Sequence, residues 1–163
     1  GFFMQNESRK IANTLHHTFE GTPWHGKSLM EILQNVDEDN CNLQLNESHT
    51  ILALVQHITS WRKFVIEKLK GNDAFDLTVE ENFKESKVEW NKALENLKKT
   101  QEELLHLIRQ SPVLKLEGKV PGRTYTFEIM LHGLIHHDIY HAGQLAMILL
   151  YGKGKSSAQK NKN

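Results

Sequence analysis

The chain has 163 residues, with 20 Lys and Arg side chains balanced by 20 Asp and Glu side chains, so its formal net charge is zero. This length fits a single domain whose core is large enough to fold unaided. Nucleic-acid-binding proteins usually carry a basic excess that neutralises phosphates, so the balanced charge argues against a nucleic-acid partner. The sequence has no run of roughly 18 apolar residues, which argues against a membrane-spanning helix.

Ten histidines are present, and histidine is both the commonest metal ligand and the usual proton carrier near neutral pH. The only cysteine, Cys41, cannot form an internal disulfide, which is typical of proteins from a reducing compartment. We therefore expect a cytoplasmic protein. Cys41 falls in a polar loop away from the other notable residues, so we expect an incidental thiol rather than a nucleophile.

Apolar residues recur every three or four positions between the three prolines, which indicates a mostly helical chain. Long helices are predicted over about residues 7–19, 46–71, 79–110 and 124–152. A short helix follows Ser28, a good N-terminal cap, and an irregular link covers 113–123. The apolar stripes predict these inward positions: Ile11, Leu15 and Thr18 or Phe19; Ile51, Leu54, His57 or Ile58, Trp61, Phe64 and Val65; Phe83, Trp90, Leu94, Leu97, Leu104 and Ile108; Phe127, Met130, Leu134, His137, His141, Gln144, Ile148 and Tyr151.

Four amphipathic helices bury their stripes by packing together, so the predicted fold is an all-α four-helix bundle. The linkers are long, and we do not expect simple up-down-up-down connectivity. The bundle should form one domain over residues 1–152. The polar residues 153–163 cannot build a core and are expected to be a disordered tail.

His137 and His141 are four residues apart, so on a helix their Cβ atoms lie about 5–6 Å apart on one face. That face is otherwise apolar, and burying an unpaired imidazole costs about 1–3 kcal/mol. A divalent cation bound by both rings would offset this cost. His57, on the apolar stripe of another helix, is the best candidate for a third ligand. Three protein ligands leave coordination positions open, which is typical of catalytic metal sites.

Other interpretations of these histidines are open. A single histidine on an apolar stripe, such as His57, is more often a hydrogen-bonded core residue than a metal ligand. His132 and His136 form a second pair four residues apart. This second pair falls on the flank of the helix rather than on its apolar stripe, so the sequence favours the pair His137 and His141.

Four further residues are candidates for the surroundings of the site. Trp61, one turn after His57, is expected to pack in the core and to wall a pocket. Gln144 lies on the site side of its helix and could orient a ligand or simply join helices. Asp138 is about 100° round the helix from His137, which makes it a poor direct ligand but a candidate supporting or surface group. His16 is near the apolar face of the first helix and could border the pocket. A purely structural role is the more common one for all four.

The segment from His137 to Gln144 resembles the last-helix signature of the DinB/YfiT-like metalloenzyme family: a histidine, three residues, a second histidine, a small residue and Gly-Gln. His57 matches the family's remaining histidine. Trp24, ahead of Ser28, and the closing Gly152 also follow the family pattern. The resemblance covers most of residues 5–152, although the third helix matches only as a helix.

This resemblance implies a four-helix bundle of unusual connectivity, often dimeric, so we expect a homodimer. It also implies that His57, His137 and His141 bind one divalent metal ion, Ni or Zn in the first place and Fe or Mn as further candidates. Characterised members of the family include S-transferases that join a low-molecular-weight thiol such as bacillithiol to an electrophile. A mycothiol-dependent isomerase is related, and many members have no known reaction.

The expected function is therefore metal-dependent thiol transfer to a small-molecule substrate. A cation favours thiolate over thiol, and the thiolate is the nucleophile. The same site could instead lower the pKa of a bound water and hydrolyse a substrate. A non-catalytic bundle that binds a metal or a small ligand is the second alternative. A nucleic-acid partner, suggested by the family's DNA-damage name, is disfavoured by the neutral charge.

Overall fold

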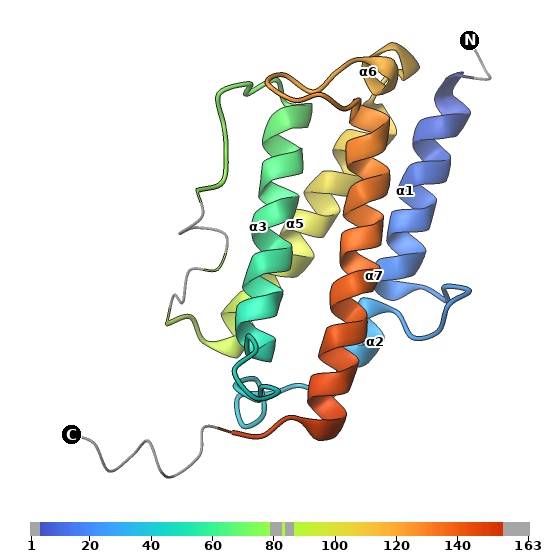
Figure 1. Ribbon diagram of the computed structural model, residues 1–163. Coiled ribbons are helices and arrows are strands. Elements are labelled where there is room, and N and C mark those ends of the chain that lie inside the picture. Colours follow the sequence, from blue (N-terminus) through green and yellow to red (C-terminus); the bar gives the residue numbers. More distant parts are fainter. Residues whose placement is uncertain (1–3, 79–82, 84–86, 155–163) are drawn as a thin grey trace.

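The computed structural model describes residues 4–78, 83 and 87–154. Within this part, four long helices form a bundle: α1 (Met4–Glu20), α3 (Ile51–Leu69), α5 (Trp90–Gln110) and α7 (Phe127–Tyr151). Two short helices, α2 (Leu29–Leu33) and α6 (Val113–Glu117), lie near opposite ends of the bundle (Figure 1). The predicted all-α four-helix bundle is confirmed. No helix in the described ranges is both long and apolar enough to cross a membrane.

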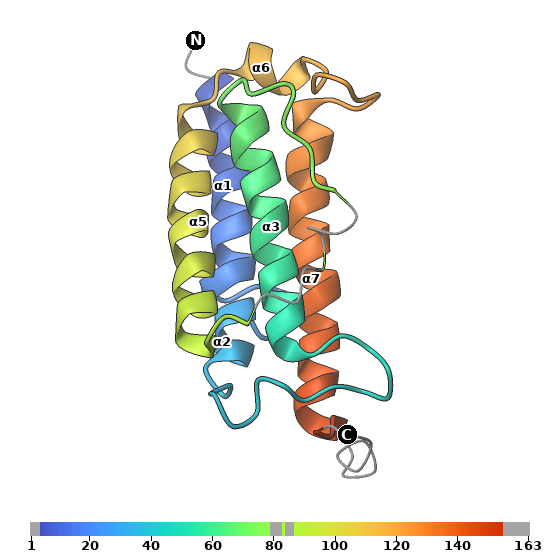
Figure 2. The same ribbon diagram turned by 90° about the vertical axis from the view of Figure 1, so that its left-hand side faces the viewer.

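The order of the helices round the bundle differs from their order in the chain. Helix α3 contacts α5 and α7, and α1 also contacts α5 and α7, so the order round the bundle is α1, α5, α3, α7. Helices α3 and α5 run in the same direction, and α1 and α7 run opposite to them (Figures 1 and 2). The chain must therefore travel back along the bundle between α3 and α5. The predicted departure from up-down-up-down connectivity is confirmed.

This return explains why the predicted start of the third long helix, near Val79, is wrong. Val79 itself lies outside the described residues, but Phe83 is in a turn and residues 87–89 are not helical. Helix α3 has 19 residues and is therefore about 28 Å long, so the chain needs an extended segment of similar reach before α5 can begin. Helix α5 begins at Trp90, whose backbone N–H donates to the Glu38 carboxylate at 2.6 Å.

Helix α3 also begins later than predicted. Asn46 has a positive φ of 49°, and Ser48 accepts a hydrogen bond from the Leu45 N–H, so residues 45–48 form a turn. Thr50 is the N-cap, and its hydroxyl accepts from the Ala53 N–H at 3.1 Å. Sequence periodicity does not distinguish this turn from a first helical turn, because the deciding hydrogen bonds are made by side chains.

The remaining boundaries agree more closely with the sequence. Ser28 forms a capping box with Glu31 at the start of α2, and Thr126 caps α7. Two expectations are wrong: the link 113–123 contains the short helix α6, and Tyr151 is 64% exposed instead of inward. The backbone of Lys153 pairs with that of Gln44, and residues 155–163 of the expected tail lie outside the described part.

The core consists of two apolar clusters stacked along the bundle axis. One cluster includes Phe64–Leu69 of α3 and Leu104–Ile108 of α5, and the other includes residues 51–58 and 90–97 of the same helices. Helix α7 contributes residues up to Ile135 to the first cluster and residues from Ala142 to the second. Several of the buried polar side chains lie between the clusters, among them Arg62, Gln101, Asp138 and His141. The bundle therefore contains a polar layer at mid-height.

Candidate metal centre

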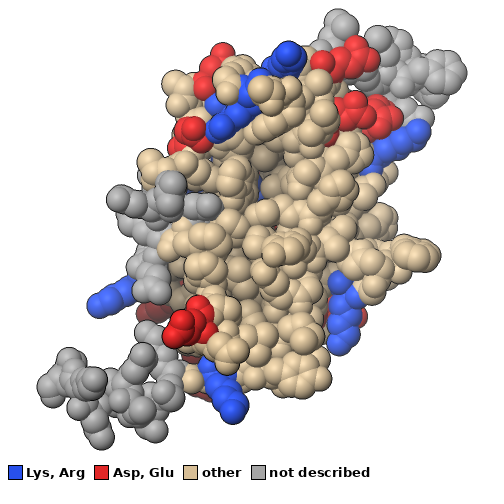
Figure 3. Space-filling view, viewed as in Figure 1, with Lys and Arg blue, Asp and Glu red and all other residues tan. Residues whose placement is uncertain are grey.

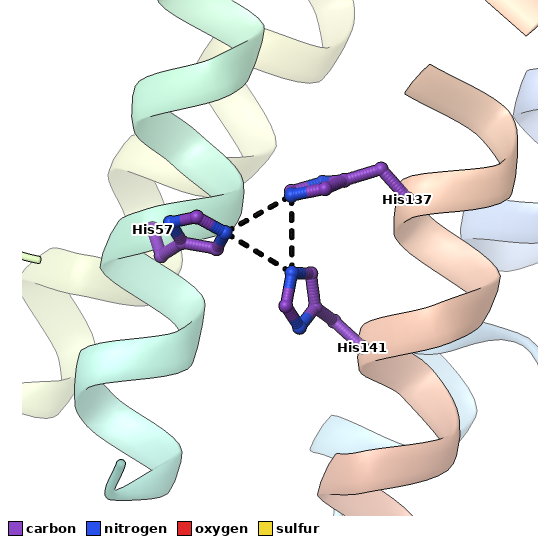
Figure 4. A group of neighbouring side chains, drawn as sticks. All are labelled: His57, His137 and His141. Carbon is purple, nitrogen blue, oxygen red and sulfur yellow. Dashed lines mark hydrogen bonds between the residues drawn. The ribbon is translucent and has the colours of Figure 1, made fainter. Parts of the chain in front are cut away.

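Three histidines meet beside this polar layer, between α3 and α7 (Figure 4). The Nε2 atom of His57 lies 3.0 Å from the Nε2 atoms of both His137 and His141, and those two are also 3.0 Å apart. His57 and His141 are buried, and His137 is partly buried. The α-helical spacing of four places His137 above His141, and the packing of α3 on α7 brings His57 to them.

The arrangement of these nitrogens fits a shared cation. Each ring offers at Nε2 either one N–H donor or one lone pair, so three mutually close Nε2 atoms cannot all form well-directed hydrogen bonds with one another. Nitrogens that bind one zinc ion at about 2.0–2.1 Å each can lie at most about 4.2 Å apart, and the observed 3.0 Å is within this limit. The buried three-histidine group can therefore hold a metal ion.

The electrostatics of the site keep the imidazoles of His137 and His141 neutral. Burial, together with the neighbouring His141, His57 and Arg62, lowers the pKa of His137 to about 3. Burial also lowers the pKa of His141, against the opposing effects of Gln144 and Asp138. Both rings are thus deprotonated at neutral pH, which is the form that coordinates metals.

Gln144 fixes the orientation of His141. The Nδ1 atom of His141 lies 2.6 Å from Oε1 of Gln144, one turn further along α7. A ring that donates its Nδ1–H to this oxygen carries its lone pair on Nε2, toward the other two histidines. By contrast, the buried Nδ1 of His137 has no hydrogen-bond partner among the described residues.

A buried ion pair lies directly behind the histidines. Arg62 donates from Nη1 and Nη2 to the two carboxylate oxygens of Asp138, at 2.7 and 2.5 Å, and both side chains are fully buried. Its Nε–H donates to Oε1 of Gln101 at 3.0 Å, and its guanidinium lies 5.2 Å from the centre of the Phe19 ring. Arg62 thus contacts side chains from all the other long helices. Asp138 is a supporting group and not a surface residue.

Sequence analysis missed Arg62 and Gln101. A signal for Arg62 was present, because it falls on the apolar stripe formed by Ile58, Val65 and Leu69. Asp138 falls in the same way on a second stripe of α7 that contains Ile135 and Ala142, which the predicted stripe did not include. Opposite charges on two buried stripes predict a pair, because an unpaired buried charge is very costly.

Aromatic side chains cover the His57 ring. Phe83 stacks on His57 with ring centres 4.1 Å apart and planes 6° apart, and His49 stacks on Phe83 at 3.8 Å and 5°. Phe83 was predicted as part of the third helix, but the structure places it at the site. This contact places one residue from between α3 and α5 against the candidate metal centre.

Two cavities flank the histidines along the groove between α3 and α7. The first, of about 300 Å³, is lined by Trp61 and His137 together with apolar residues of both helices, so the expectation that Trp61 walls a pocket agrees with its position. The ring centres of Trp61 and His137 are 6.1 Å apart. The second cavity, of about 420 Å³, is lined by Gln144, Gly143 and His49 among others. The first cavity therefore reaches the histidine group at His137, whereas none of the three histidines lines the second cavity.

The competing histidines lie elsewhere. His136 is exposed, and His132 lies at the surface 4.0 Å from Glu128. His132 does form a second group of three possible ligands with Glu7 and Glu128, but such exposed groups are common in proteins without a metal. His16, a candidate for the pocket border, contacts Glu20 and His17 on its own helix.

Cys41 and Trp24, which were also singled out in the sequence, differ in burial. Cys41 lies in a turn outside the helices, as expected, but it is 1% exposed and packs in the second apolar cluster. Burial and the nearby Glu38 carboxylate raise the pKa of the Cys41 thiol, which disfavours the reactive thiolate. Trp24 is fully exposed.

Comparison with known protein families gives one match, which agrees with the site geometry. Residues 24–145 match the family model of the DinB superfamily. Searches for similar curated proteins and for similar solved structures give no significant match. The matched region contains all three histidines of the candidate metal centre and most of the bundle. On this evidence the chain belongs to the DinB superfamily.

Proposed function

We propose that this protein is a divalent-metal-dependent enzyme that transfers a low-molecular-weight thiol to a small electrophile. The observation that carries the proposal is the convergence of the three histidine Nε2 atoms, 3.0 Å from one another, on one point between α3 and α7. Imidazole ligands suit Ni, Zn and Fe, and Ni or Zn is our first expectation, with Fe or Mn as alternatives. A cation held by three protein ligands would keep positions open for a substrate atom.

The chemistry of the proposed reaction suits the residues present. A divalent cation at this position would favour the thiolate form of a thiol, which is the nucleophile. The sulfur then forms a bond to the electrophilic carbon, the leaving group departs with its bonding electron pair, and the thiol proton is released to solvent. The histidines contribute neutral donors, and Gln144 orients one of them.

The state of Asp138 favours thiol transfer over hydrolysis. A metal-dependent hydrolase commonly uses a carboxylate or histidine as general base to move the proton of the attacking water. Asp138 is the acidic residue within the histidine motif, but both of its oxygens accept hydrogen bonds from Arg62. Asp138 is therefore already engaged and is not positioned to act as that base, whereas the cation itself would promote formation of the thiolate.

Metal content is the first test. We would measure bound metal by elemental analysis on the wild-type protein and on His57→Ala and His137→Ala, after growth or incubation with Ni, Zn, Fe and Mn. Near-stoichiometric metal in the wild type, lost in both variants, is the expected result. His136→Ala is the matched control, because His136 is exposed on the same helix and outside the group. Wild-type protein that takes up none of these ions would overturn the proposal.

Activity is the second test. The metal-loaded protein would be mixed with bacillithiol or another small thiol and with chlorodinitrobenzene, whose thioether product absorbs near-ultraviolet light. We expect thioether formation that disappears in His57→Ala and persists in Cys41→Ser. Hydrolysis of activated esters without thioether formation would favour the hydrolase alternative. Stoichiometric metal without either reaction, over a broad set of electrophiles, would favour the non-catalytic binding bundle.

We also propose that the protein is a homodimer that binds no nucleic acid. Near the C-terminal end of α7, four large apolar side chains are at least half exposed: Tyr140, Met147, Leu150 and Tyr151. Such a stripe on one helix suits a self-complementary contact. Light scattering on Leu150→Glu and wild type tests the dimer, with a monomeric wild type as the contrary result.

The distribution of charge argues against a nucleic-acid partner. On the face drawn in Figure 3, both blue and red side chains lie at the rim, and they form no basic band.

A further inference from the structure

We propose that the cavity beside His137 binds an uncharged, apolar group of one or two rings, held against the histidine centre. The assignment of this group to a substrate rests on the proposed function, whereas the existence of the binding site does not. The cavity has a volume of about 300 Å³ and lies between α3 and the first half of α7. Because His137 belongs to both the cavity wall and the three-histidine group, an occupant would touch the centre.

The walls of the cavity carry no formal charge. Trp61 and Tyr125 supply aromatic surface, Ile129 and Gly133 come from α7, and the other lining residues within the described ranges are apolar apart from His137. A charged group placed there would lose its hydration without gaining a partner, which costs several kcal/mol or more. An apolar group instead gains about 25 cal/mol for each Å² removed from water.

The cations near this cavity are already engaged. Arg123 and Lys68 each lie about 5.4–5.5 Å from the centre of the Phe64 ring, which lines the cavity. Arg123 forms an ion pair with Asp76 at 2.7 Å, and Lys68 donates to the Asp73 carbonyl at 2.7 Å. An anionic substrate group would have to break these contacts to be held here. The chemistry of the cavity therefore selects for neutral groups.

The cavity volume sets the size of the occupant. An apolar cavity of about 150 Å³ is enough to bind benzene. The observed volume of about 300 Å³ is at the lower limit of small-ligand pockets and suits one or two aromatic rings or a branched aliphatic group.

Gly133 provides a direct way to fill the cavity. A Cβ atom built on Gly133 meets no atom within 4 Å, so a larger side chain is accepted without backbone strain. Helical side chains point back toward the preceding turn, so a leucine here would lie toward Ile129 and occupy the cavity. The exchange also raises helix propensity by up to about 1 kcal/mol, so the variant should fold at least as well as the wild type.

Gly143 provides the matched control on the same helix. It lines the second cavity, of about 420 Å³, and a Cβ built there also meets no atom within 4 Å. Gly143→Leu therefore makes the same chemical change, with the same gain in helix propensity, on the other side of the histidines.

The test uses prodan, an uncharged naphthalene derivative with two fused rings, whose emission rises and shifts to the blue in apolar surroundings. We expect saturable binding to the wild-type protein, a loss of affinity of at least tenfold in Gly133→Leu, and a change of less than about twofold in Gly143→Leu. Equal affinity of Gly133→Leu and wild type would overturn the proposal. Loss of probe binding in Gly143→Leu but not in Gly133→Leu would also overturn it, because the probe would then occupy the second cavity. Failure of the wild-type protein to bind the probe would overturn it as well.

A second measurement separates this proposal from the proposed function. His141→Ala, which does not line the cavity, should lose metal while keeping the affinity for the probe. In the cobalt-loaded wild type, the bound probe should alter the visible absorption of the ion, because His137 touches both. If the protein binds no metal but binds the probe, and Gly133→Leu abolishes that binding, the proposed binding site is supported and the proposed metal-dependent function is contradicted. An unchanged cobalt spectrum at saturating probe would overturn the contact with the centre.

Discussion

The Arg62 guanidinium on α3 holds the Asp138 carboxylate on α7 through two hydrogen bonds of 2.7 and 2.5 Å, with both side chains fully buried. Asp138 follows His137 directly in the chain, and Arg62 is five residues after His57. The ion pair therefore joins the same two helices, at the same height, as the three histidines. It fixes the rotation of α7 against α3 that turns His137 and His141 toward His57.

We predict that Arg62→Met destabilises the protein by about 3–5 kcal/mol, because it leaves the Asp138 carboxylate buried and unpaired. Urea unfolding followed by circular dichroism measures this loss. The double variant Arg62→Met with Asp138→Leu should recover most of the stability, because the uncompensated charge is gone. A single variant as stable as the wild type would contradict this account of the ion pair.

The orientation of His141 by Gln144 leads to a second prediction. Gln144→Ala should weaken metal binding by about 10–100-fold, because the ring loses the acceptor that holds its lone pair toward the centre. Competition against a chelator of known affinity measures this effect. Gln144→Glu keeps an oxygen acceptor and should keep tight binding. An alanine variant with wild-type affinity would show that packing alone orients the ring.

The lowered pKa of His137 predicts how the stability of the metal-free protein depends on pH. Its value is about 3 in the folded protein against an ordinary value of 6.5, so between these values the unfolded chain binds a proton that the folded chain does not. The contribution of His137 is fully present above pH 6.5 and is lost as the pH falls toward 3. The free energy of unfolding should therefore decrease on acidification, by up to about 1.4 kcal/mol per pH unit for this group.

Urea unfolding of chelator-treated protein at several pH values between 7 and 4 measures this dependence. His137→Ala should reduce the slope, and the exposed His136→Ala should leave it unchanged. A stability that rises on acidification in this range would contradict the lowered pKa.

The burial of Cys41 leads to a fourth prediction. Its thiol has a raised pKa and is 1% exposed, so we expect slow alkylation by iodoacetamide in the folded protein and rapid alkylation in urea. Mass spectrometry at successive times follows the reaction. Rapid alkylation under native conditions would mean that the loop carrying Cys41 opens readily, and would restore this thiol as a candidate nucleophile.

The limits of the sequence are clearest where the helices begin. The periodic apolar stripes predicted four long helices, and each of them exists, because burial of one face is a local property of the sequence. The predicted starts of α3 and α5, near residues 46 and 79, were wrong, because these helices begin at Ile51 and Trp90. The observed starts depend on a side-chain turn at residues 45–48 and on the distant Glu38 carboxylate. The first contact is local but is made by a side chain, the second joins residues 52 positions apart, and neither leaves a periodic pattern in the sequence.

The histidine motif and the spacing to His57 were sufficient to select the three residues that the fold brings together, since helical spacing places His137 over His141 whatever surrounds them. Only the tertiary structure decided the rest of the site. The packing of α3 on α7 created the Arg62–Asp138 ion pair, placed Phe83 on the ring of His57, and left a cavity beside His137. One helix alone specifies which side chains share a face, whereas what that face contacts is determined by the helices packed against it.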